Sequence, residues 1–320
     1  VYKRQGVNMK ALITGGAGFI GSHLAEELLK QGHQVTIIDD LSTGEFENIA
    51  HLTENDNFRF AIDTVTNEVV MDRLASESDT IFHMAAAVGV KLIVENPVRT
   101  IETNIMGTEA VLKAALRYRA KVIIASTSEV YGDPTVNPQP EDYWGNVNPV
   151  GPRGVYDESK RFAEALATAY HRIHGVEVRI ARIFNTYGPR MRKNDGRVVP
   201  TLINQALQGQ DLTVFGDGSQ TRSFCYIDDM IEGIFLLYHS SVTEPINLGN
   251  PDEKRINEFA EIILRLTGSK SKIVYQELPV DDPKMRCPDI TKAKNLLKWE
   301  PKTSLEEGLK KTIDFFKGSL

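Results

Sequence analysis

The chain has 320 residues, 41% of them hydrophobic and 25% charged, and its 37 basic and 43 acidic side chains give a net charge of −6 at pH 7. This length predicts two domains, or one large α/β domain with a smaller lobe. The charge balance and the lack of a basic block argue against nucleic acid and anionic membranes as main partners. No apolar run approaches the roughly 18 residues of a membrane span, and residues 1–10 lack the apolar core of a signal peptide. Cys225 and Cys287 form neither a disulfide framework nor a zinc motif. We therefore expect a cytoplasmic enzyme without a metal.

Apolar strands and amphipathic helices alternate along the first half of the chain. Strand-like runs cover residues 10–14, 35–38, 80–85, 121–126 and 176–183, and helical stripes cover 22–31, 98–118 and 155–174. Near-continuous apolar strands that alternate with helices are typical of βαβ units, in which helices cover both faces of a parallel sheet. The pattern therefore predicts a Rossmann-type, doubly wound α/β fold.

Beyond residue 185, glycine and proline separate shorter elements, which indicates a smaller C-terminal lobe. We expect helices at 198–208, 257–267 and 304–316, and a strand at 246–248 that rejoins the sheet. Asp228 and Asp229 are expected to cap a further helix. The predicted domains are residues 9–185 with a returning segment at about 227–250, and a lobe of residues 186–226 and 251–320.

A glycine-rich turn predicts a dinucleotide site. Gly15, Gly18 and Gly21 lie between the first strand and the first helix, where a tight turn and a helix N-terminus can hold a diphosphate. The second strand ends in Asp39, eighteen residues after Gly21. A carboxylate there accepts hydrogen bonds from a ribose diol and repels a 2′-phosphate, so NAD is favoured over NADP.

Tyr156 and Lys160 lie four residues apart at the start of the helix at 155–174, so they share one face of it. A neighbouring ammonium stabilises a phenolate, and we expect it to lower the pKa of Tyr156 towards a value useful for a base. The strand at 121–126 leads into Thr127 and Glu129 at the carboxyl edge of the sheet, where open α/β folds bind ligands. The pattern predicts a catalytic site at this edge.

With these motifs in place, the chain resembles the extended short-chain dehydrogenase/reductases that act on nucleotide sugars. The stretches at 126–134, 141–149, 151–153 and 281–290 look most like those of the UDP-glucuronate decarboxylases. The related 4,6-dehydratases carry Asp-Glu where this chain has Ser128 and Glu129, which disfavours a dehydratase. The alanine-rich loop at 83–90 instead resembles that of the 4-epimerases.

The resemblance implies roles for particular residues. The catalytic group would be Tyr156, Lys160, Thr127, Glu129 and Arg286. The NAD contacts would be Gly15, Gly18, Phe19, Ile20, Gly21, Asp39, Asp40, Ser42, Thr43, Gly44, Asp63, Thr64, Ala85, Ala87, Asn104, Tyr156 and Lys160. The substrate contacts would be Asn185, Arg190, Val199, Thr213, Phe215, Arg222 and Arg286.

The implied activity is NAD-dependent decarboxylation of UDP-glucuronate to UDP-xylose through a 4-keto intermediate, with NAD recycled. A UDP-uronate or UDP-hexose 4-epimerase is the alternative on the same fold, and a non-catalytic NAD(H)-binding sensor is a distant one. Apolar stripes on the helices at 98–118 and 155–174 predict a homodimer through a four-helix bundle, as in this family.

Overall fold

The computed structural model describes residues 8–87, 89, 95–194, 196–278 and 285–318. Its central sheet has seven parallel strands in the order β11-β6-β5-β4-β1-β2-β3. These strands are β1 (Lys10–Thr14), β2 (Gln34–Asp39), β3 (Phe58–Ile62), β4 (Thr80–His83), β5 (Lys121–Thr127), β6 (Val178–Ile183) and β11 (Ile246–Leu248). The arrangement confirms the predicted doubly wound α/β fold. Because the strand order reverses between β1 and β4, a ligand site is expected at the carboxyl ends of these two strands.

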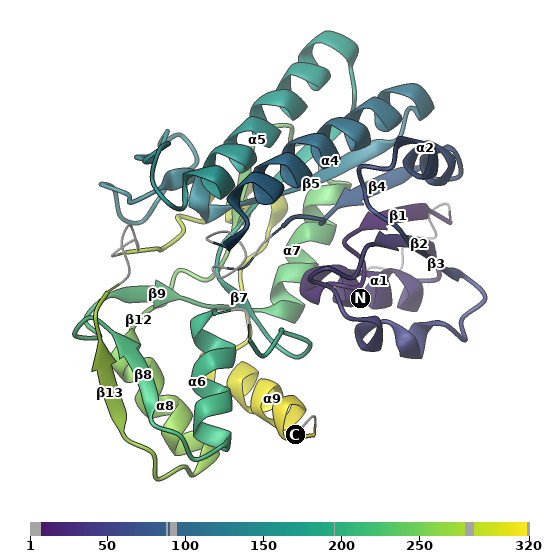
Figure 1. Ribbon diagram of the computed structural model, residues 1–320. Coiled ribbons are helices and arrows are strands. Elements are labelled where there is room, and N and C mark those ends of the chain that lie inside the picture. The colour runs from purple at the N-terminus through teal and green to yellow at the C-terminus, as the bar shows by residue number, and fades with distance from the viewer. Residues whose placement is uncertain (1–7, 88, 90–94, 195, 279–284, 319–320) are drawn as a thin grey trace.

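Helices cover both faces of the sheet (Figure 1). On one face, α4 (Pro97–Tyr118) packs between α2 (Glu68–Ser76) and α5 (Gly154–His174); on the other, α1 (Phe19–Lys30) packs against α7 (Ile227–His239). Neighbouring side chains of β1 pack on opposite faces of the sheet. Leu12 belongs to the core under α4 and α5, and Ile13 to the core under α1 and α7, and both are fully buried. Burial on both faces explains why the strands are apolar throughout. No helix within the described ranges is long and apolar enough to cross a membrane.

Some elements differ from their predicted limits. α1 begins at Phe19, three residues early, because the glycine turn leads directly into it. β4 ends at His83 and β6 begins at Val178, each two residues inside the predicted run. The sequence pattern does not reveal β3 or α2. β3 is an edge strand whose Phe60 and Ile62 are exposed, so it lacks a continuous apolar run.

The second lobe lies in the lower left of Figure 1 and follows β6 in the chain. Its helices α6 (Val198–Leu207), α8 (Ile256–Thr267) and α9 (Leu305–Gly318) pack against one another and match their predicted positions within two residues. Three pairs of short strands complete it: β8 (Leu212–Phe215) with β13 (Ile273–Gln276), β9 (Thr221–Ser223) with β12 (Glu253–Arg255), and β7 (Thr186–Tyr187) with β10 (Cys225–Tyr226).

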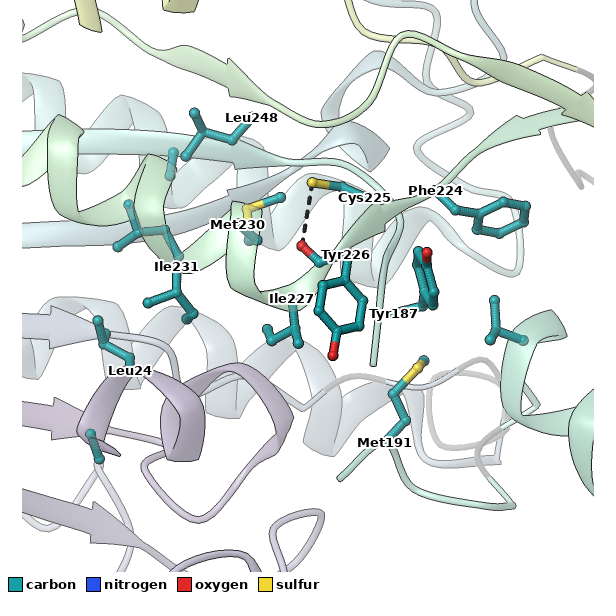
Figure 2. Close-up of a cluster of buried hydrophobic side chains, with 14 of the residues drawn as sticks. Leu24, Tyr187, Met191, Phe224, Cys225, Tyr226, Ile227, Met230, Ile231 and Leu248 are labelled. Carbon is teal, nitrogen blue, oxygen red and sulfur yellow. Dashed lines mark hydrogen bonds between the residues drawn. The ribbon is translucent and has the colours of Figure 1, made fainter. Parts of the chain in front are cut away.

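One apolar core continues from the sheet into the second lobe. Figure 2 shows part of it, from Leu24 of α1 past Ile231 of α7 to Cys225 and Phe224. These side chains, with Leu248 of β11, are at most 5% exposed. Elements that are far apart in the sequence therefore share one packed interior, which holds the lobe in place against the sheet.

The start of α7 corrects one prediction. Asp228 and Asp229 lie in its first turn but do not cap it, because Tyr226 occupies the N-cap position. Asp229 instead accepts a hydrogen bond from Thr303 N at 2.9 Å, and its carbonyl accepts one from Trp299 Nε1 at 3.0 Å. This residue thus ties the C-terminal segment to α7.

Candidate active site

A cavity of about 800 Å³ lies between the carboxyl edge of the sheet and the second lobe. Its walls come from the loop after β1, the ends of β2, β5 and β6, the loop after β4, the start of α5, and the lobe elements α6, β8 and β9. Sites for small molecules and cofactors have volumes of about 300–1,000 Å³. The cavity therefore has the size and the place in the fold of a ligand site.

The glycine loop at 15–21 forms a backbone cradle in this wall. Gly15 has a φ of +70°, and a Cβ on it would lie 2.7 Å from the backbone of Ala85. A Cβ on Gly21 would lie 2.2 Å from Gly15 O. The N-cap of α1 is Gly18, which offers no side-chain cap, so the first N–H groups of the helix are left for a ligand. Such groups and the positive end of the helix dipole bind phosphate, so the loop fits the diphosphate of a dinucleotide.

Asp39 is buried at the end of β2 and lines the cavity. Its carboxylate accepts hydrogen bonds from Ala17 N and Leu41 N, both at 2.9 Å. Burial raises the pKa of Asp39 above its usual value, although these hydrogen bonds oppose the rise. A Cβ on Gly44 would lie 2.8 Å from both carboxylate oxygens. The carboxylate that the sequence assigns to a ribose diol therefore also braces the glycine loop.

Most residues predicted to contact the cofactor line the cavity. They are Gly15, Gly18, Phe19, Ile20, Gly21, Asp39, Asp40, Ser42, Thr43, Thr64, Ala85, Ala87, Tyr156 and Lys160. Gly44, Asp63 and Asn104 do not line it. Asn104 lies behind the wall, where Oδ1 accepts a hydrogen bond from Ala87 N at 2.8 Å and Nδ2 donates to Ser159 Oγ at 3.0 Å. Asp63 is hydrogen-bonded within its own turn.

The structure brings the predicted catalytic side chains together. Thr127 ends β5, Tyr156 and Lys160 lie one turn apart at the start of α5, and all three line the cavity. The Thr127 hydroxyl lies close enough to Tyr156 to lower its pKa. Lys160 Nζ donates to Ala125 O at 2.8 Å and lies 5.9 Å from the centre of the Tyr156 ring. The arrangement can exchange a proton with a hydroxyl of a bound ligand.

The ionisation of Tyr156 and Lys160 differs from the expectation. Burial raises the pKa of Tyr156 above its usual value, the charge of Glu129 adds to the rise, and the hydrogen bond with Thr127 opposes it. Burial also lowers the pKa of Lys160 to about 8, against the charge of Glu164. The predicted lowering of the Tyr156 pKa is therefore wrong here, because desolvation of the phenolate is the largest effect on this pKa and raises it.

Glu129 is held between two guanidinium groups. It lies in the short helix η3 (Ser128–Tyr131), and its Oε2 accepts hydrogen bonds from Arg153 Nη2 at 2.9 Å and Arg286 Nη2 at 3.3 Å. Burial by itself would raise the pKa of Glu129, but the charges of Arg286, Arg153 and Arg222 outweigh it and keep this pKa below its usual value. Glu129 is therefore a carboxylate at neutral pH.

Arg286 is 1% exposed, yet it is part of the cavity wall. Its guanidinium also donates to the carbonyls of Ser128 and Gly132. Its Nε is also buried and has no hydrogen-bond partner among the described residues. Gln139 positions this segment, because its backbone N donates to Cys287 O at 2.8 Å and its Oε1 accepts from Cys287 N at 2.9 Å.

The sequence analysis assigns no role to Arg153, which the structure places in the cavity wall beside Glu129. Arg153 is the N-cap residue of α5 and lies three residues before Tyr156. This i, i+3 spacing across the helix start is the signal that could have identified it. Thr100 and Thr103 of α4 also line the cavity, and nothing in the sequence pattern points to them.

All seven residues predicted to bind substrate line the cavity. They are Asn185, Arg190, Val199, Thr213, Phe215, Arg222 and Arg286. Arg190 forms an ion pair with Glu26 of α1, and its Nη1 is buried without a partner in the described part of the chain. Arg222 donates from Nη1 to Thr221 O at 2.8 Å. The lobe thus contributes cations and apolar side chains to the same space.

The sequence matches the family model described as GDP-mannose 4,6 dehydratase over residues 12–312. UDP-glucuronic acid decarboxylase 1 of Xenopus tropicalis is 50% identical over 311 residues, which cover 97% of this chain and 73% of that protein. UDP-glucuronic acid decarboxylase 1 of Danio rerio is 51% identical with the same coverage. A solved structure of UDP-glucuronic acid 4-epimerase from Bacillus cereus, in complex with UDP-glucuronic acid and NAD, has a TM-score of 0.89 and 33% identity, and covers 98% of this chain and 100% of its own.

Proposed function

Because the chain belongs to the extended short-chain dehydrogenase/reductase family, which includes the UDP-glucuronic acid decarboxylases, we propose that it converts UDP-glucuronate into UDP-xylose and CO₂. The observation that carries this proposal is the cluster of Glu129, Arg153 and Arg286 beside Thr127 and Tyr156. A sugar with a carboxylate needs cations at that place, and a neutral hexose does not.

NAD is the proposed cofactor. The cradle at 15–21 would hold its diphosphate, Asp39 its ribose diol, and the wall near Tyr156 and Lys160 its nicotinamide end. When bound, NAD would accept a hydride from C4 of the sugar and return it at the end of the cycle.

Tyr156 would accept the proton of the 4-hydroxyl, with the Thr127 hydroxyl beside it. Lys160, with a pKa of about 8, is mainly charged at pH 7 and would stabilise the phenolate that this step requires. The resulting 4-keto sugar has its C6 carboxylate β to a ketone, so CO₂ can leave while the electron pair moves into an enolate. Thr127 and Tyr156 would then donate hydrogen bonds to the enolate oxygen.

The substrate carboxylate would lie against Arg286 and Arg153, and Glu129 would act near C5 through water when the enolate is reprotonated. Asn185, Arg190 and Arg222 would bind the UDP diphosphate, and Val199, Thr213 and Phe215 would enclose the uracil. In this proposal, residues 9–185 and about 227–250 bind NAD, and residues 186–226 and 251–320 bind the nucleotide sugar.

A single incubation of the NAD-loaded protein with UDP-glucuronate tests the activity. We expect CO₂ and a UDP-pentose by mass spectrometry. Formation of UDP-galacturonate without CO₂ would replace this proposal with the 4-epimerase, which the alanine-rich wall at 85–87 and the solved epimerase structure favour. Binding of NAD without turnover would favour the sensor.

We also propose a cytoplasmic homodimer. Its support is the apolar side chains that α4 and α5 leave exposed. These two helices pack against each other on one side of the sheet (Figure 1). Val98 and Met106 of α4 and Phe162 and Ile173 of α5 are all exposed. Two such pairs of helices can form a four-helix bundle across a two-fold axis. The cytoplasmic location is supported by the buried, free thiols of Cys225 and Cys287.

A further inference from the structure

Asp157 is a buried carboxyl group that the proposed reaction does not use. It lies next to Tyr156 in the first turn of α5, which packs against η3, and it is 7% exposed. Its Oδ1 has no hydrogen-bond partner in the described part of the chain. An ionised carboxylate in such a place loses its hydration without compensation, so the neutral acid is the favoured form.

Within the described ranges, charged groups from several parts of the chain act on Asp157. Glu129 belongs to η3, Arg153 and Glu158 flank Asp157 along α5, and Arg286 comes from the segment after residue 284. Arg153 and Arg286 both donate to Glu129. Burial raises the pKa of Asp157 to about 7, the charge of Glu129 adds to the rise, and the two guanidiniums oppose it. Ionised Asp157 would place a second anion beside the two cations that the proposed function assigns to the substrate carboxylate.

We propose that Asp157 is a positioning residue that sets specificity for a uronate, because its protonated form adds no second anion beside Arg153 and Arg286, against which the carboxylate of the sugar would lie. Ionisation of Asp157 would repel that carboxylate and would not affect a sugar without one. This inference rests on the proposed function in taking UDP-glucuronate as the ligand.

The test compares two ligands that differ only at C6. We would measure the affinities of UDP-glucuronate and UDP-glucose for the NAD-loaded protein by calorimetry between about pH 6 and about pH 8.5, for the wild type and for Asp157→Asn. For the wild type, we expect the ratio of the UDP-glucuronate affinity to the UDP-glucose affinity to fall by about tenfold or more across this range, while the titration of Lys160 acts on both ligands. In Asp157→Asn, which cannot ionise at this position, the ratio should stay at the value that the wild type has at low pH.

A wild-type ratio of the two affinities that does not change with pH would overturn the inference without any variant. So would an Asp157→Asn protein that keeps the wild-type pH dependence, or one that binds UDP-glucuronate weakly at every pH. Failure of the proposed function looks different, because the incubation with UDP-glucuronate would then give no CO₂ and no UDP-pentose, whatever the pH dependence of the affinities.

Discussion

The side chain on which the proposed chemistry depends most is Arg286. It is buried, and its guanidinium donates hydrogen bonds to Glu129 and to two backbone carbonyls. Removing one member of a buried ionic group leaves the other charged and desolvated, so its loss affects the site beyond one contact. The planar guanidinium also makes several directed hydrogen bonds that an ammonium cannot reproduce.

We predict that Arg286→Ala lowers the rate of UDP-glucuronate turnover by about 10²-fold or more, the usual scale for a lost contact in the transition state. Arg286→Lys should recover only part of this loss, because it restores the charge but not the planar set of N–H donors of the guanidinium. Arg265, in the last turn of α8, forms an exposed ion pair with Glu306 and provides the control. Arg265→Ala should turn over at the wild-type rate, and an Arg286→Ala protein as active as this control would contradict the assignment.

Asp157 should also affect stability. Its pKa is raised in the folded protein to about 7, from about 3.9 in an unfolded chain, so the folded state binds the proton more tightly. The contribution of Asp157 to the free energy of unfolding is therefore fully present below about pH 4. It is lost as pH rises to about 7, by at most about 1.4 kcal/mol per pH unit. Urea unfolding at several pH values should show this loss in the wild type and not in Asp157→Asn. Parallel pH profiles of the two proteins would contradict the raised pKa.

At the scale of elements, the turn between β1 and α1 depends on the close approach of its own backbone. A Cβ on Gly21 would lie 2.2 Å from Gly15 O, so Gly21→Ala must displace the loop. We expect its affinity for NAD to fall by at least about tenfold, which corresponds to 1.4 kcal/mol of binding free energy. A Cβ on Gly318, at the end of α9, would have no atom within 4 Å, so Gly318→Ala is the control. Fluorescence titration with NAD measures the affinity of both variants. Equal affinities would rule out the cradle as the diphosphate site.

The segment that carries Arg286 depends on Gln139, which is fully buried. Besides its bonds to Cys287, its Nε2 donates to Val136 O at 2.8 Å, and its backbone O accepts from Asp289 N at 2.9 Å. Gln139→Met keeps the side-chain size but removes the side-chain hydrogen bonds. We expect kcat/KM for UDP-glucuronate to fall by about tenfold, with little change in UDP-glucose affinity, since only the position of Arg286 is disturbed. Gln31→Met on the surface is the control. Equal losses for both ligands would indicate a general effect on the fold.

For the whole molecule, the exposed apolar faces of α4 and α5 predict association. We expect a dimer by light scattering at micromolar concentration, and a monomer when Met106→Glu and Phe162→Glu are combined, because buried charges oppose an apolar interface. Leu296→Glu, at another exposed apolar position outside these helices, should remain dimeric. A monomeric wild type, or a double variant that stays dimeric, would exclude this interface.

The fold class, most strands of the sheet and the place of the candidate site could be predicted from the sequence. Fully buried strands such as β1 and β5 are recognisable because both of their faces are apolar, and the glycines of the turn because backbone approach excludes a Cβ. Thr127 and Tyr156 could be assigned to one place because the ends of parallel strands and the helices that follow them meet at one edge of the sheet. These features depend on local patterns and on the rules of the fold.

Which charged side chains meet depends on the packing of distant parts of the chain. Glu129 and Arg286 are 157 residues apart in the chain, and no periodicity relates them. The contact of Arg153 with Glu129 and the burial that raises the pKa of Tyr156 also depend on how η3, α5 and the C-terminal segment pack. Because desolvation and Coulomb interactions depend on distance in space rather than along the chain, the ionisation of the site could not be predicted before the fold was known.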